Sequence, residues 1–156
     1  MNDVMLLGEK KRYPFVVAVH WFAFNPDGKV LLLRRYNTGY MDGSYSVPAG
    51  HVDGQETVRS AMLREIHEEV GVQLSQDDLQ FVHVMHRTQH SEPFERIDFF
   101  FANYGVSAKV INCEPEKCDE LIWVDPKQPP KNMVEYVAKA LAYVTQKEFY
   151  SEHAEA

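Results

Sequence analysis

Three glutamates on one stripe of a predicted helix are the feature that most constrains this chain. Apolar residues within 57–70 recur at helical spacing: Val58, Ala61, Met62, Ile66 and Val70. Gly71 follows, where a helix C-cap glycine belongs. Glu65, Glu68 and Glu69 stand at positions i, i+3 and i+4, so their carboxylates share one stripe. The stripe is either a solvated acidic face or a site for a hard divalent cation such as Mg2+, which prefers oxygen ligands.

Strand-like segments surround this helix. Runs rich in β-branched and aromatic residues predict strands at 15–24, 30–36, 45–47, 79–86, 96–104 and 121–124. Turn-forming residues at 25–28 predict that the first two of these strands form a hairpin. Loops are expected at 37–44, from Pro48 to Gly54, and at 90–95.

A second helix is expected near the end of the chain. Pro126, Pro129 and Pro130 interrupt regular structure, and a helical pattern follows at about 133–143. We therefore expect one domain over residues 1–156, of the α/β (α+β) class, in which a mixed β-sheet is sandwiched between helices.

Composition narrows the range of partners. The 156 residues include 23 acidic and 16 basic side chains, a formal charge of −7 that argues against a protein that coats nucleic acid. That charge does not exclude a polyanionic substrate, because bound cations would reverse the sign of an acidic surface. Cys113 and Cys118 are expected to be free thiols. The start of the chain lacks the pattern of a signal peptide, and the apolar run 15–24 is too short to span a membrane. We expect a cytoplasmic protein.

A longer motif contains the acidic stripe. Gly50, Glu56 and residues 64–72 satisfy every fixed position of G-x5-E-x7-R-E-U-x-E-E-x-G-U, where U is a bulky aliphatic residue. This pattern resembles the Nudix box of the Nudix hydrolase family, and the chain has the size of MutT-like members. Where many members carry Pro-Gly-Gly before the box, this chain has Pro48-Ala49-Gly50. The resemblance implies the Nudix fold and Mg2+-dependent hydrolysis of a diphosphate, with Mn2+ able to substitute.

The resemblance also implies roles for individual residues. Glu65, Glu68, Glu69 and the carbonyl of Gly50 would bind metal, and Glu116 is a candidate ligand from outside the box. Candidate catalytic carboxylates are Glu69, Glu120 and Glu65, with the general base sought at Glu69 or Glu120. For Glu116 and Glu120 the alternative is a solvated acidic loop.

A supporting ion pair is also implied within the box. Arg64 and Glu56 match a pair in the family, in which the arginine fork holds the carboxylate. The alternative is an ordinary surface pair.

Substrate contacts are expected from four residues. Arg35 and Arg87 are candidates to hold phosphate oxygens, and Arg34 is set aside because neighbouring strand residues face opposite ways. Tyr40 is a candidate stacking group. Asn132 ends the run Pro129-Pro130-Lys131-Asn132, which is similar to a Pro-Pro-x-Asn run in MutT-type enzymes, where the asparagine binds a purine. Asn132 is also a favoured helix N-cap, and we place the cap first.

The expected reaction follows from the resemblance. A nucleoside triphosphate, including oxidised purine nucleotides, would be cleaved to the monophosphate and pyrophosphate. One alternative is an ADP-ribose or nucleoside diphosphate sugar pyrophosphatase. Another is a non-catalytic nucleotide-sensing module, although such a module is expected to lose box glutamates. The expected partner is a small nucleotide, and the protein is expected to be a monomer or a homodimer.

Overall fold

The computed structural model describes residues 5–7, 10–89 and 94–155. Four residues of the loop expected at 90–95, residues 90–93, lie outside these ranges. In chain order the elements are β1 (Met5–Leu7), β2 (Lys10–Arg12), β3 (Phe15–Ala23), β4 (Val30–Arg35), β5 (Tyr45–Ser46), β6 (Ala49–His51), α1 (Val58–Val70), the 3-10 helix η1 (Gln76–Asp78), β7 (Gln80–Gln89), β8 (Glu95–Asn103), β9 (Cys118–Val124), α2 (Glu135–Thr145) and β10 (Tyr150–Glu155).

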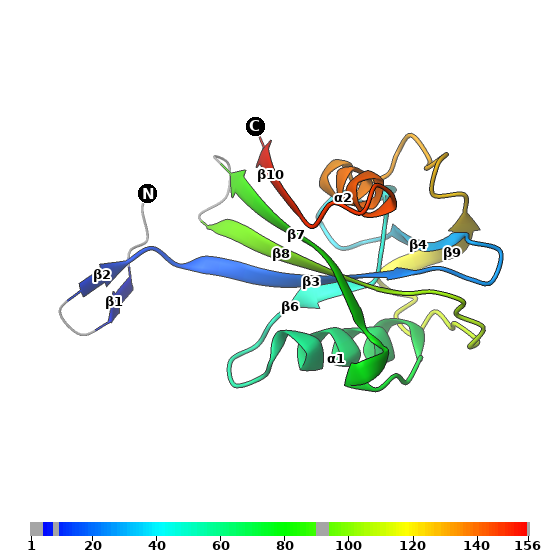
Figure 1. Cartoon of the computed structure of the whole chain (residues 1–156), viewed down its shortest axis with the longest axis horizontal. Coiled ribbons are helices and arrows are strands. Elements are labelled where there is room, and N and C mark those ends of the chain that lie inside the picture. Colours follow the sequence, from blue (N-terminus) through cyan, green and yellow to red (C-terminus); the bar gives the residue numbers. More distant parts are fainter. Residues whose placement is uncertain (1–4, 8–9, 90–93, 156) are drawn as a thin grey trace.

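A mixed central sheet carries the fold. Its strand order is β10-β7-β8-β3-β6, with β3 parallel to β8 and β10 parallel to β7, whereas β7–β8 and β3–β6 are antiparallel. A second, antiparallel sheet has the order β5-β4-β9. Figure 1 shows α1 on one side of the central sheet and α2 on the other. The expected sheet sandwiched between helices is confirmed.

Alternation along β3 explains why the sheet needs a helix on each face. Val19 and Trp21 are fully buried in the core cluster that includes the apolar residues of α1. Phe22, one position further on, is fully buried in the cluster that includes the apolar residues of α2. Successive strand residues point to opposite faces, so both faces of the sheet are apolar and both are covered.

Local signals define the ends of α1 as expected. Thr57 is the N-cap, and its side chain accepts a hydrogen bond from the Ser60 N–H. Gly71 is the C-cap with φ of 71°, and its N–H donates to the His67 carbonyl. Glycine tolerates this left-handed conformation without the steric cost that a side chain would bring. The helix therefore ends at Val70, two residues before the buried Val72, which joins the α1 side of the core.

The predicted hairpin is wrong beyond its turn. The turn forms, with the Asn25 N–H donating to the Lys29 carbonyl, but only Phe24 and Val30 pair across it. The strands then separate, because β3 joins the central sheet and β4 joins the second sheet.

Several other expectations about strands were also wrong. β6 lies within the expected loop after Pro48, and β9 begins three residues earlier than predicted. Strands β1, β2 and β10 were not predicted. Figure 1 shows β1 and β2 away from the other elements, at the N-terminal end of β3.

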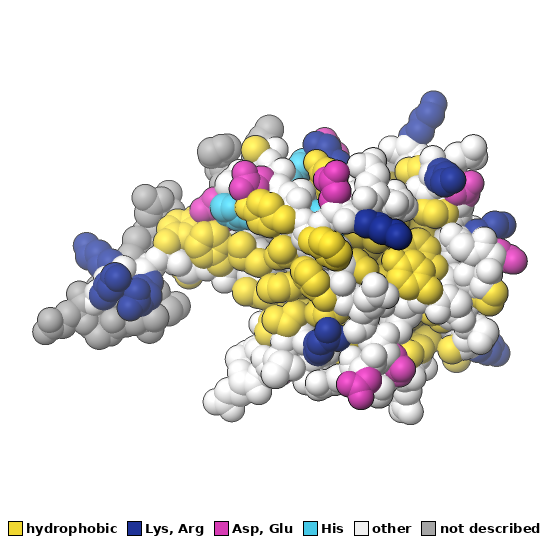
Figure 2. All heavy atoms as spheres, viewed as in Figure 1, with side chains coloured by type: hydrophobic (Ala, Val, Ile, Leu, Met, Phe, Trp, Pro, Cys, Tyr) yellow, Lys and Arg dark blue, Asp and Glu magenta, His cyan; other side chains and the backbone are white. Residues whose placement is uncertain are grey.

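The surface is mixed in character. On the face in Figure 2, hydrophobic side chains gather over the strands between α1 and α2, and charged side chains lie around them. Among the described residues, neither α-helix combines the length and the apolar character needed to cross a membrane.

Candidate active site

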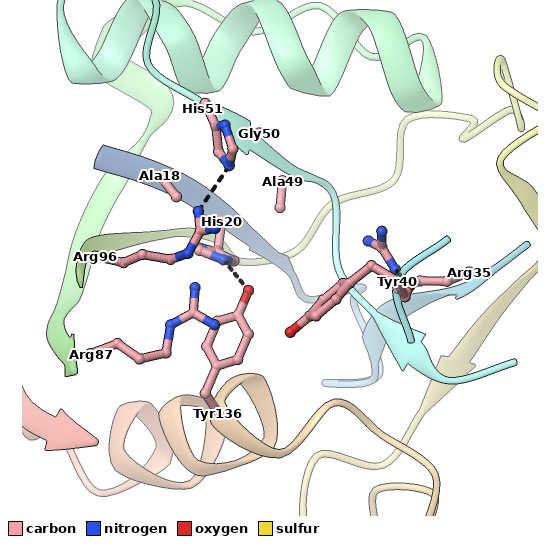
Figure 3. A pocket seen from close by; sticks show the side chains of 10 residues that line it. All are labelled: Ala18, His20, Arg35, Tyr40, Ala49, Gly50, His51, Arg87, Arg96 and Tyr136. Atoms are coloured by element: carbon pink, nitrogen blue, oxygen red, sulfur yellow. Dashed lines mark hydrogen bonds between the residues drawn. The ribbon is translucent and has the colours of Figure 1, made fainter. Parts of the chain in front are cut away.

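Two adjoining pockets meet at strand β6. The larger, about 620 Å³, we call the acidic pocket because five carboxylate residues line it: Asp53, Glu65, Glu68, Glu69 and Glu114. The smaller, about 350 Å³, we call the arginine pocket because it is lined by Arg35, Arg87 and Arg96 (Figure 3). All three residues of β6, and also Arg35, line both pockets.

Gly50 and Glu65 are in close contact within the acidic pocket. A Cβ atom added to Gly50 would overlap the Glu65 carboxylate. Only glycine allows this approach, so the first residue of the motif places its backbone directly against the first glutamate of the stripe. Burial raises the pKa of Glu65, and the hydrogen bond from Arg64 lowers it.

Arg64 organises the box as a two-sided fork. Its Nη2 donates to Glu56 Oε1 at 2.7 Å and to the His51 carbonyl at 3.1 Å. Its Nη1 donates to Glu65 Oε1 at 2.8 Å and lies 3.5 Å from Glu68 Oε2. Glu56 also accepts from the Asp53 N–H, which closes the loop before α1. Arg64 thus links that loop to the acidic stripe.

Glu69 is the most buried carboxylate of the stripe. Its Oε2 accepts a hydrogen bond from the Ala49 N–H at 2.9 Å. Burial raises the pKa of Glu69 well above its usual range, and the nearby Glu65 charge raises it further. A carboxylate in this position is stabilised by any cation that enters the pocket.

Of the acidic residues near Cys113 and Cys118, Glu114 lines the acidic pocket and Glu116 does not. The Cys113 N–H donates to the Glu69 carbonyl, which docks this loop on the end of α1. Glu116 is exposed. The sequence did not favour Glu114, because the docking depends on a backbone contact that no residue pattern encodes. Both cysteines are free thiols, as predicted.

Glu120 lies with Arg34, away from the acidic pocket. Arg34 Nη1 is 3.3 Å from Glu120 Oε2, and the same guanidinium donates twice to Asp119, at 2.7 and 3.1 Å. Glu120 and Arg34 are also paired in register between β9 and β4. The structure therefore does not bring Glu120 to the other candidate carboxylates.

Arg35 lies at the junction of the two pockets. Its Nε donates to the Tyr40 carbonyl at 2.7 Å and its Nη2 to Thr38 Oγ1 at 3.0 Å. Its guanidinium carbon is 5.2 Å from the centre of the Tyr40 ring. These contacts orient both candidate substrate-binding residues together.

Arg87 is buried at the base of the arginine pocket. It donates to both oxygens of the fully buried Asp98, at 3.0 and 3.3 Å, and to Glu155 at 3.2 Å. Its guanidinium carbon lies 3.6 Å from the centre of the Tyr136 ring.

Tyr136 connects Arg87 to a histidine that the sequence left without a role. The Tyr136 hydroxyl lies 3.0 Å from His20 Nε2 (Figure 3). Burial lowers the pKa of His20 to about 4, so His20 is neutral at neutral pH. His20, Tyr136, Arg87 and Asp98 thus form a fixed polar network beneath the pocket. His86, the other histidine without a role, is partly buried and lies 3.5 Å from Glu95.

The cap predicted at Asn132 is wrong. The N-cap of α2 is Val134, which makes no side-chain capping bond. Asn132 Nδ2 instead donates to the Gly43 carbonyl at 2.9 Å, and the Asn132 carbonyl accepts from the Tyr45 N–H at 3.0 Å. The exposed Asn132 thus ties the loop before β5 to the segment before α2.

Within the described ranges, no three His, Cys, Asp or Glu side chains are drawn together as in a formed metal site. Arg64 Nη1 lies 2.8 Å from Glu65 Oε1 and 3.5 Å from Glu68 Oε2, so both carboxylates face the same guanidinium.

A family model for the NUDIX domain matches residues 14–144. The chain belongs to the Nudix family. The match extends from the start of β3 to the end of α2, so it covers both pockets as well as the box.

Solved structures share this Nudix fold. The MutT NUDIX hydrolase from Burkholderia pseudomallei is 23% identical with a TM-score of 0.73, over 83% of this chain and 97% of that one. The MutT protein from Methanosarcina mazei Go1 is 21% identical with a TM-score of 0.74, over 86% and 95%. The NUDIX domain of Shewanella oneidensis NrtR, complexed with ADP ribose, is 15% identical with a TM-score of 0.70, over 87% and 90%. At these identities the likeness establishes the fold.

The matches to curated proteins are shorter. An RNA pyrophosphohydrolase of Tolumonas auensis is 46% identical over 55 residues, which are 35% of this chain and 28% of that protein. An ADP-ribose pyrophosphatase of Methanocaldococcus jannaschii is 44% identical over 46 residues, 30% of this chain and 27% of that protein. Each match spans little more than a quarter of the relative's length.

Proposed function

We propose that this protein hydrolyses a diphosphate linkage in a nucleoside derivative with the help of Mg2+ or Mn2+. Its preferred reaction converts a nucleoside triphosphate, including oxidised purine nucleotides, to the monophosphate and pyrophosphate. One observation carries the proposal: Glu65, Glu68 and Glu69 of the box line the same pocket as Gly50 and Arg35. Carboxylates for a cation thus lie beside a guanidinium for phosphate oxygens.

The residues of the acidic pocket fit a hard divalent cation. Glu65, Glu68, Glu69 and the Gly50 carbonyl would hold it, and Glu114 takes the place expected of Glu116. The buried Glu69 carboxylate, with its raised pKa, favours the arrival of positive charge. A bound cation would neutralise phosphate charge and lower the pKa of a water molecule.

Arg64 can release Glu65 and Glu68 to a cation at a small cost in free energy. Only its Nη1 contacts Glu65 and Glu68, so these two carboxylates can turn to a cation while Nη2 keeps Glu56 and the His51 carbonyl. The loop before α1 therefore stays in place while the stripe changes partner.

Glu69 is our choice for the general base. It lies in the acidic pocket, as does Glu65, whereas Glu120 is paired with Arg34. A general base must come within hydrogen-bond reach of the proton it accepts, either directly or through one water. Arg35 would hold phosphate oxygens and Tyr40 would line the path of the substrate.

Asn132 remains the candidate purine contact. Its amide group is exposed even though one hydrogen goes to Gly43. An amide offers a donor and an acceptor, which suits a purine edge. This supports the nucleoside triphosphate as preferred substrate. The ADP-ribose alternative is favoured by the similarity to an ADP-ribose pyrophosphatase over 46 residues.

A substrate panel tests the proposal. Canonical and oxidised nucleoside triphosphates, ADP-ribose, sugar nucleotides and RNA with a 5′-triphosphate are incubated with the protein and Mg2+ or Mn2+. Release of pyrophosphate from nucleoside triphosphates, with the largest kcat/KM of the panel, is the expected result. A larger kcat/KM for ADP-ribose, with AMP as product, would favour the alternative. Turnover of no compound would favour a nucleotide-sensing module.

A substitution at Gly50 probes the contact with Glu65. Gly50→Ala is expected to lower kcat/KM by about 100-fold, because the added Cβ displaces the Glu65 carboxylate and shifts of about 1 Å cost this much. Gly54→Ala is the matched control, since a Cβ there meets nothing within 4 Å. Steady-state kinetics and thermal melts are measured for both variants. Equal activity in the two variants would show that the contact has no functional role.

A further inference from the structure

The arginine pocket extends the acidic pocket along strand β6. Ala49, Gly50 and His51 line both, and Arg35 lines both from the opposite side. A diphosphate bound over Gly50 therefore has the arginine pocket as its immediate neighbour. The group that follows the diphosphate in a substrate must enter or avoid this space.

Donor groups dominate the arginine pocket. Three guanidinium side chains line it, and among the described residues that line it there is no carboxylate. The charge of Arg87 is already balanced by Asp98 and Glu155, so its guanidinium is a fixed part of the pocket lining. Arg35 and Arg96, which also line the pocket (Figure 3), are less buried than Arg87.

These donors are held in position before any ligand arrives. Arg35 is fixed by Tyr40 and Thr38 through Nε and Nη2, and its Nη1 makes no hydrogen bond within the described part of the chain. Arg96 Nη1 lies 3.1 Å from His51 Nε2, which ties it to β6. Preorganised donors lose little conformational entropy on binding, and guanidinium groups match the oxygens of phosphates and carboxylates.

We propose that the arginine pocket is a subsite for an anionic group that the substrate carries next to the scissile diphosphate. In a nucleoside triphosphate this group is the terminal phosphate, and in an acidic sugar nucleotide it is a carboxylate. The pocket, of about 350 Å³, is large enough for such a group. The inference rests on the proposed function.

Matched substrate pairs test the subsite. A nucleoside triphosphate is compared with its diphosphate, and UDP-glucuronate with UDP-glucose, so that each pair differs by one anionic group. The pair that shows a preference in the native protein identifies phosphate or carboxylate as the source. In Arg96→Gln, kcat/KM for the charged member of that pair is expected to fall by about 10- to 100-fold, the usual loss of a charged hydrogen bond. The smaller member should change far less.

Controls separate charge recognition from loss of structure. Arg34→Gln removes the neighbouring guanidinium, which pairs with Asp119 on the other side of β4, and should leave the preference unchanged. Arg96→Lys keeps the charge and should restore part of the preference, and thermal melts report folding of every variant. Equal loss of kcat/KM for both members of a pair would overturn the subsite. The substitution would then have acted through His51 or on the nucleobase, which both members share. Turnover of no pair would instead overturn the proposed function.

Discussion

Glu68→Gln is expected to reduce kcat by on the order of 100- to 1,000-fold or more at saturating Mg2+, while the protein stays folded. The amide keeps the size of the side chain but lacks the negative charge that holds a cation. Glu68 is 51% exposed and lies 3.5 Å from Arg64, so its removal costs little packing. The measurement is pyrophosphate release under steady-state conditions, with a thermal melt of each protein.

Glu135→Gln is the matched control for this variant. Glu135 begins α2, is 75% exposed and pairs with Lys139, so it is a helix-surface glutamate outside both pockets. Its replacement should leave kcat unchanged. Full activity of Glu68→Gln at saturating Mg2+ would contradict the metal assignment, because one charge of the stripe would then be dispensable.

Arg87→Met is expected to destabilise the protein by about 3–5 kcal/mol. The fully buried Asp98 would keep its charge and lose both hydrogen bonds from the guanidinium. For a chain of this size such a loss corresponds to a fall in Tm of about 10 °C. Urea unfolding followed by circular dichroism measures the change in free energy of unfolding.

A double variant shows whether the stranded charge is the cause. Arg87→Met combined with Asp98→Leu removes the pair together and should recover much of the lost stability, since a buried pair can be replaced by apolar groups at low cost. Arg34→Met, at an exposed pair with Asp119, should change stability only slightly. A small effect of Arg87→Met alone would show that the buried pair contributes little to stability.

Local patterns carried the correct part of the sequence prediction. The helix α1 was predicted because its apolar spacing and Gly71 after its last residue are encoded within a few residues. The sandwiched sheet followed from the number of apolar segments. The Nudix box was recognisable because its spacing fixes which side chains meet at one end of that helix.

Long-range pairing explains what the sequence did not reveal. Strand β10 alternates exposed and buried residues, but the inward positions hold polar Ser151 and His153. Ser151 Oγ lies 2.7 Å from His83 Nε2 on β7, so its burial depends on a partner 68 positions away. No apolar periodicity marks such a strand. The separation of β3 from β4 is equally hidden, because a turn signal says nothing about which sheet each strand joins.

The residues of the candidate site also divide into those placed by local patterns and those placed by long-range contacts. Box residues were placed by spacing along one helix, whereas Glu114 and Asn132 depend on contacts between distant loops. Asn132 has the residue type of a cap, but the helix begins after Val134 and the amide is used by Gly43. A side chain with several possible partners cannot be assigned from residue type alone.

Strand β6 lines both pockets, and this limits which substitutions can change substrate specificity alone. Its three residues form the edge of the central sheet, and Ala49 and His51 are paired with His20 and Ala18 of β3. A substitution that shifts this strand alters both cavities at once, so effects on turnover and on substrate choice should be non-additive there. New specificities are more accessible through Tyr40 or through Arg96 of β8, which of these two pockets line only the arginine pocket. Evolution in the laboratory should therefore accumulate changes at those positions and leave β6 intact.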